Sequence, residues 1–123
     1  MEKEKIIAIS FEGSVLKGVE EDERDWRGFV NGSVRNGVFE KLHTLKERGW
    51  RVRVFSWRFI DEGIRREVIG WLNDWENGWR RAIVESGGAP PFNCLITSFC
   101  EFKSSPGVYD VIVDERALKN FPN

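Results

Sequence analysis

Hydroxyl, carboxylate and guanidinium groups follow several short apolar runs in this chain of 123 residues. A serine hydroxyl and an arginine suit the oxygens of a phosphate, because arginine forms charge-assisted and often bidentate hydrogen bonds. Carboxylate oxygens are typical ligands of Mg²⁺. Residues of these types directly follow three of the apolar runs: Ser10 and Glu12, then Ser56 and Arg58, then Asp114 and Glu115.

Four apolar stretches predict β-strands, because they are short, contain β-branched residues and are bounded by turn-forming residues. They cover residues 5–11, 50–57, 92–98 and 109–114. Apolar residues at helical spacing predict two helices, one from residue 38 to Gly49 and a longer one over residues 62–86. Asp61 is suited to be the N-cap of the longer helix, and we expect Gly78 to interrupt it.

Strands that alternate with helices predict a parallel sheet, since parallel strands need crossover connections. We therefore expect one domain over residues 1–123, an α/β fold of the Rossmann-like three-layer α/β/α type with a mainly parallel central sheet. Ligands bind to such sheets outside the carboxyl ends of the strands, which selects the polar residues above. Residues 13–37 predict a flap or mini-cap insertion, whose acidic stretch is either a solvated loop or a lid that discriminates substrates by charge.

The charge balance and the N-terminus exclude some classes of partner. Because 19 basic and 20 acidic residues give a net charge of −1, we expect no nucleic-acid partner. The apolar run near the N-terminus is too short for a signal peptide or a membrane span, so we expect a cytoplasmic protein without a membrane partner. Cys94 and Cys100 are interpreted as reduced thiols in or near the core, with a redox pair as the alternative. His43, the one histidine, should lie away from the strand ends.

The order of these motifs resembles the haloacid dehalogenase (HAD) superfamily of phosphohydrolases, and most closely its minimal, cap-poor members. IIAISFEGS is similar to the first motif, Asp-x-Asp-x-Thr, and VRVFSWR supplies the hydroxyl of the second. LKERGWRVRVFSWR and YDVIVDERALKN fit the minimal members over longer stretches, so the resemblance covers nearly the whole chain. It implies Mg²⁺-dependent hydrolysis of phosphomonoesters through an aspartyl phosphate.

The resemblance also implies a role for each matching residue. Ser10 stands at the position of the nucleophile and Glu12 at that of the general acid/base. The implied phosphate-binding residues are Ser56, Arg58 and Lys103, and the implied Mg²⁺ ligands are Asp114, Glu115, Ser10 and Glu12, the last through its carbonyl. Lys103 is the nearest lysine before the last strand, although the closest relatives place that lysine beside proline.

Ser10 departs from the family pattern where the chemistry is most demanding. An alcohol is uncharged at neutral pH, needs a general base to become a nucleophile, and removes one anionic ligand from Mg²⁺. Glu12 is one methylene longer than the family's aspartate, which matters because proton transfer needs tight geometry. We therefore expect weak Mg²⁺ binding and impaired hydrolysis, with recognition of a phosphate retained.

Each of these signals also has a plainer structural interpretation. Ser10 can satisfy a backbone group at the end of its strand, and the acidic pair 114–115 can be a solvated strand end. The stripe of Trp71, Trp75 and Trp79 is typical of a helix face packed on a sheet. If part of that stripe is exposed, it can instead form a homodimer through the tryptophan-rich helix.

Three functional hypotheses follow from the sequence. The first is a pseudoenzyme that binds a small phosphorylated ligand without covalent phosphoryl transfer. The second is a Mg²⁺-dependent phosphomonoester hydrolase with an altered nucleophile, in which water attacks directly and Glu12 or Asp114 is the base. The third is an interaction module that dimerises through its tryptophans.

Overall fold

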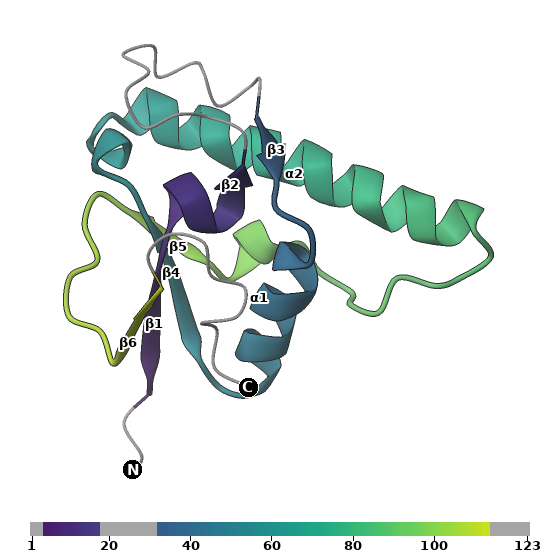
Figure 1. Ribbon diagram of the computed structural model, residues 1–123, viewed down its shortest axis with the longest axis horizontal. Coiled ribbons are helices and arrows are strands. Elements are labelled where there is room, and N and C mark those ends of the chain that lie inside the picture. Colours follow the sequence, from purple (N-terminus) through teal and green to yellow (C-terminus); the bar gives the residue numbers. More distant parts are fainter. Residues whose placement is uncertain (1–3, 18–31, 114–123) are drawn as a thin grey trace.

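The computed structural model describes residues 4–17 and 32–113, and its centre is a four-stranded sheet (Figure 1). All neighbouring strands in this sheet pair in parallel. The sheet has the order β5-β4-β1-β6, where the strands are β1 (Ile6–Ser10), β4 (Arg51–Phe55), β5 (Glu101–Lys103) and β6 (Val111–Val113). The predicted α/β fold with a parallel sheet is therefore confirmed.

Two α-helices, α1 (Val38–Glu47) and α2 (Glu62–Glu85), connect and cover these strands. The Asp61 side chain accepts a hydrogen bond from the Ile64 amide at 3.1 Å, which confirms the predicted N-cap. The expected break at Gly78 is wrong, because α2 continues through it. A glycine inside a helix costs only about 1 kcal/mol, and the packing of neighbouring α2 side chains against α1 can offset that cost.

None of the helices in residues 4–17 and 32–113 combines the length and the hydrophobicity that crossing a membrane requires.

The third predicted strand, over residues 92–98, is wrong. Ile96–Ser98 forms a short 3₁₀ helix, and the strand at this edge of the sheet is β5, which begins only at Glu101. The backbone of Ile96 is satisfied without a sheet, since its amide donates to the Glu76 carboxylate at 2.7 Å and its carbonyl accepts from the Cys100 amide at 2.9 Å. Ile96 is buried in a turn instead of a strand, so Thr97 and Ser98 do not lie at a strand end.

The core lies between the sheet and the helices. Ile7 and Ile9 of β1 stand beside Val52 and Val54 of β4 in the parallel register, and all four side chains are at most 1 % exposed. Helix residues such as Leu72 belong to the same buried cluster. Burial of this apolar surface is the main term that holds the strands and helices together.

The opposite face of the sheet carries the loop of residues 104–110. Arg53 of β4 donates through Nη1 to the carbonyl oxygens of Pro106 at 2.6 Å and Val108 at 2.9 Å. Figure 1 shows this loop on the other side of the sheet from α1. The guanidinium therefore ties the connection that leads into β6 to the central sheet.

The region predicted as a flap, residues 13–37, is described only at its two ends. There β2 (Leu16–Lys17) and β3 (Ser33–Val34) pair in antiparallel fashion. Leu16 and Val34 are buried in the core. The acidic stretch between residues 20 and 25 lies outside the described residues.

Candidate functional site

The register of the sheet brings three of the predicted site residues to one edge. Ser10 is the partner of Phe55, and Phe55 is the partner of Lys103, so β1, β4 and β5 end at the same level. Ser56 follows directly, and its amide donates to the Lys103 carbonyl at 3.0 Å. This is the carboxyl edge of the sheet, where ligands of parallel α/β folds bind.

The Ser10 hydroxyl is part of a buried hydrogen-bond chain. Its Oγ donates to the Glu12 carbonyl at 3.0 Å and lies 2.8 Å from the Oγ of Ser14. The Ser14 hydroxyl in turn donates to the Val113 carbonyl at 3.4 Å, which links the turn after β1 to the end of β6. Ser10 is 5 % exposed and Ser14 is fully buried. These hydroxyls stabilise the turn at Phe11–Val15, where Gly13 has a φ of +87° that favours glycine.

The Glu12 carboxylate contacts two of the side chains predicted to bind phosphate, Ser56 and Arg58. Its Oε1 accepts a hydrogen bond from the Ser56 Oγ at 2.7 Å and lies 3.4 Å from Nη1 of Arg58. The Arg58 amide donates to the same Ser56 Oγ at 3.2 Å. Ser56 and Arg58 therefore converge on one point at the carboxyl edge, and an oxygen of the chain's own carboxylate occupies that point.

Burial strengthens these contacts. The side chain of Arg58 is 10 % exposed and that of Glu12 is 23 % exposed. Electrostatic interactions between partly buried groups are screened less than those on an open surface. The guanidinium carbon of Arg58 also lies 5.3 Å from the ring centre of Trp57, which is itself 72 % exposed. Arg58 is thus held between a carboxylate and an aromatic ring.

Three other residues were predicted to bind phosphate or a metal ion, namely Lys103, Asp114 and Glu115. Lys103 ends β5 at this edge, and its side chain is exposed. Asp114 and Glu115 follow β6 in the sequence but lie outside the described residues. Of the four predicted metal ligands, the structure therefore describes only Ser10 and Glu12, and the Ser10 hydroxyl lies 3.0 Å from the Glu12 carbonyl.

Among the described residues at this edge, Glu12 is the one predicted Mg²⁺ ligand that carries a carboxylate. Magnesium prefers near-octahedral oxygen ligands with carboxylates among them. The Glu12 carbonyl already accepts the Ser10 hydroxyl, and the Glu12 carboxylate is committed to Ser56 and Arg58. Residues 4–17 and 32–113 also contain no cluster of three His, Cys, Asp or Glu side chains that could hold a metal ion.

Sequence reasoning missed a second polar cluster, inside the core. The Oε2 of Glu76 on α2 lies 2.6 Å from Nε2 of His43 on α1, and the two side chains are at most 3 % exposed. The His43 ring stacks on Phe92, with ring centres 4.3 Å apart and an interplanar angle of 7°. His43 belongs to this cluster in the core, while the candidate site lies at the strand ends. The lone histidine was the one signal in the sequence, and it does not identify its partner.

The two cysteines are free thiols in different environments. Cys94 is exposed and Cys100 is buried, so the expectation that both lie in or near the core holds for Cys100 alone. Burial raises the pKa of the Cys100 thiol, and the negative charges of Glu76 and Glu101 raise it further. Cys100 therefore stays protonated and unreactive at neutral pH.

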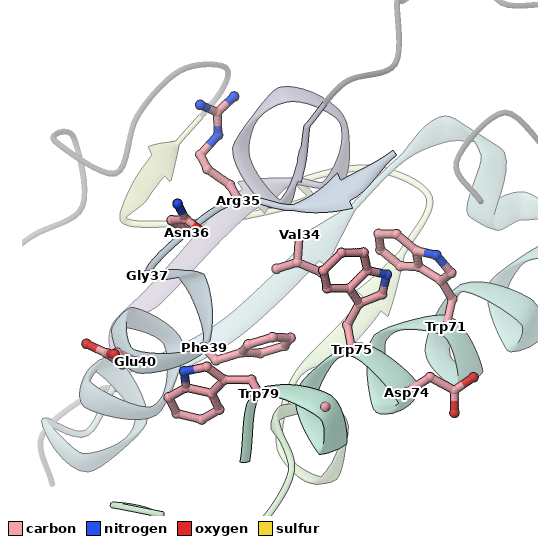
Figure 2. A pocket seen from close by; sticks show the side chains of 11 residues that line it. Val34, Arg35, Asn36, Gly37, Phe39, Glu40, Trp71, Asp74, Trp75 and Trp79 are labelled. Carbon is pink, nitrogen blue, oxygen red and sulfur yellow. The ribbon is translucent and has the colours of Figure 1, made fainter. Parts of the chain in front are cut away.

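The tryptophan stripe of α2 is only partly core. Trp71 packs edge-on against Phe11 with ring centres 6.2 Å apart, and Trp79 packs against Phe39 at 5.5 Å. Trp75, between them, is 40 % exposed. The three rings face a pocket of about 470 Å³ between α2, β3 and the start of α1, shown in Figure 2.

Comparison of the chain with models of protein families, with curated proteins and with solved structures gives no significant match.

Proposed function

We propose that this chain is a HAD-like domain that recognises the phosphate group of a small ligand and does not form a covalent phosphoryl intermediate. The proposal includes the three-layer α/β/α arrangement and the minimal cap that the motifs favour. One observation carries it. Ser56 and Arg58 converge on an oxygen of an anionic group, the Glu12 carboxylate, at the edge where parallel sheets bind ligands.

The position of that carboxylate indicates that the Ser56 hydroxyl and the Arg58 guanidinium are suited to hold an anionic oxygen. A hydroxyl and a guanidinium at 2.7 and 3.4 Å from one carboxylate oxygen are the donors that a phosphate oxygen would use. A phosphate can therefore take the place of Glu12 if the longer, partly exposed glutamate side chain turns outward. In this proposal Glu12 is an internal competitor of the ligand.

Ser10 supports the non-covalent part of the proposal. A nucleophilic serine needs an adjacent general base and access to the reacting atom. Ser10 is only 5 % exposed, its hydroxyl donates to the Glu12 carbonyl at 3.0 Å, and it lies 2.8 Å from the Ser14 hydroxyl, so it is engaged in the turn. The chain's one histidine is engaged with Glu76 in the core.

Hydrolysis of p-nitrophenyl phosphate with Mg²⁺ tests this function directly. We expect wild-type protein to show no turnover above that of the Ser10→Ala and Asp114→Asn variants, because position 10 lacks the carboxylate that forms the family's aspartyl phosphate. The double variant Ser10→Asp with Glu12→Asp, which restores the family's pair of carboxylates, should gain Mg²⁺-dependent turnover.

Wild-type turnover that is lost in Asp114→Asn would contradict the proposal. If Ser10→Ala retained that turnover, direct attack by water would be indicated, which is the hydrolase alternative. Loss in Ser10→Ala as well would indicate serine catalysis. Circular dichroism of each variant controls for folding.

A further inference from the structure

The geometry points to a second binding site, separate from the strand-end site, that takes a small molecule carrying a quaternary ammonium group. It is the pocket between α2, β3 and the start of α1, with a volume of about 470 Å³. Ligand pockets for small molecules range over roughly 300–1,000 Å³ and are lined mostly by apolar and aromatic side chains. This pocket fits that description.

Four aromatic rings line the pocket. Phe39 and Trp79 form one pair with ring centres 5.5 Å apart, and Trp71 and Trp75 form the other at 5.8 Å. Figure 2 shows the two pairs side by side, with Val34 of β3 above them. The face of an aromatic ring carries partial negative charge, so several rings around one cavity attract a cation that has shed its water.

The charges at the margin favour a cation as well. Glu40 and Asp74 line the pocket from opposite sides; both residues are exposed, and their carboxylates point outward from the four rings (Figure 2). Arg35 is the one basic residue among the described residues that line it. Its guanidinium donates to the Gly13 carbonyl at 2.6 Å and points away from the four rings (Figure 2). Two acidic residues and one basic residue therefore leave a net charge of −1 around the aromatic walls of the pocket.

A quaternary ammonium group matches this combination better than an ordinary amine. Its methyl groups fill apolar space and have no N–H to leave unpaired, while its charge remains to interact with the rings and the carboxylates. We infer a free small molecule as the occupant, because the volume is that of a compact ligand site and residues of three separate elements line it.

Choline and its uncharged isostere 3,3-dimethylbutan-1-ol separate charge from shape. The two probes differ by one atom, nitrogen against carbon. In calorimetric titrations of the full chain we expect choline to bind about threefold to thirtyfold more tightly than the isostere, the range that cation–π attraction supplies. Equal affinities, or no saturable binding of choline, would overturn the inference.

Matched aromatic variants locate the binding. Trp75→Leu should weaken choline binding by about threefold or more, since it removes an exposed ring of the pocket. Tyr109→Leu, which removes an aromatic ring of the same exposed fraction outside the pocket, should leave choline binding unchanged. Equal effects of the two variants would contradict the site.

Two further experiments test the role of the two carboxylates and whether the pocket takes a second copy of the chain or a lipid surface instead. Glu40→Gln combined with Asp74→Asn should lower the affinity for choline and leave the affinity for the isostere unchanged. Light scattering and sedimentation with phosphatidylcholine vesicles should show a monomer that stays in the supernatant. A dimer that dissociates on Trp75→Leu would assign the pocket to a second copy of the chain, and cosedimentation would assign it to a lipid surface; either result overturns the inferred free ligand.

Discussion

Replacing Glu76 with leucine should lower the free energy of unfolding by about 3–5 kcal/mol, the usual cost of removing one member of a buried polar pair. Glu76 is fully buried, and its carboxylate accepts from the Ile96 amide at 2.7 Å while lying 2.6 Å from Nε2 of His43. Leucine would leave both groups in the core without this acceptor. Urea denaturation at neutral pH, followed by far-ultraviolet circular dichroism, measures the change.

Two variants control this result. Glu76→Gln keeps an acceptor for the Ile96 amide, so its free energy of unfolding should fall clearly less than that of the leucine variant. Glu67→Leu makes the same change of charge at an exposed position of the same helix. Its free energy of unfolding should stay within about 0.5 kcal/mol of the wild-type value. If Glu76→Leu cost no more than Glu67→Leu, the buried cluster would not hold α1, α2 and the turn at Ile96 together.

Replacing Glu12 with glutamine should increase the affinity for inorganic phosphate about tenfold. In the wild-type chain the Glu12 carboxylate already accepts the hydrogen bond of Ser56 and contacts Arg58, and its negative charge repels an incoming phosphate dianion. Removing one negative charge within about 4 Å of a phosphate is worth on the order of 1–4 kcal/mol, depending on how well solvent screens it, and tenfold corresponds to about 1.4 kcal/mol. Isothermal titration of both proteins with phosphate at fixed ionic strength measures the ratio.

The matched control is Glu62→Gln, which removes an equal charge at the exposed start of α2. It should leave phosphate affinity nearly unchanged, because water and salt screen the lost charge. An unchanged or lower affinity in Glu12→Gln would mean that Glu12 does not compete for the donors. The same gain in Glu62→Gln would mean that net charge alone sets the affinity.

The sequence predicted β1 and β4, and the edge at which the candidate residues meet, because these depend on local patterns. IIAI is an apolar run of strand length and RVRVF alternates charged with apolar residues, and the sheet brings the polar ends of both strands to one edge through the register of Ser10 with Phe55. The convergence of Ser56 and Arg58 follows from their place after β4. The contact of Glu12 with both of them could not be predicted, since it depends on how the turn around Gly13 folds back.

The misplaced third strand shows where local pattern stops being sufficient. Residues 92–98 are apolar enough for a strand, but their backbone finds a partner in Glu76, which is twenty residues earlier than Ile96 in the chain. Glu76 itself stands in the polar stretch DWENGW, which resembles a solvated helix face. The shift of the strand to Glu101–Lys103 also brings Lys103 to the carboxyl edge, beside Ser56.

The tryptophan pocket, like the misplaced strand, depends on contacts between residues that are distant in the sequence. Spacing along α2 predicts that Trp71, Trp75 and Trp79 share a face, and the structure agrees. How much of that face the sheet and α1 cover depends on where β3 and the start of α1 lie, and these positions are set by contacts distant in sequence. Spacing alone therefore did not distinguish a core stripe from the wall of a pocket.

The most direct test of phosphate recognition is a nuclear magnetic resonance titration of ¹⁵N-labelled wild-type protein with inorganic phosphate, beside Arg58→Met. We expect saturable shifts of the amide signals of Glu12, Ser56 and Arg58 in the wild type. In Arg58→Met the affinity should fall by roughly tenfold or more, because a hydrogen bond to a charged group contributes about 1.5–3 kcal/mol. Wild-type shifts that do not saturate, or the same affinity in Arg58→Met, would contradict the proposed function.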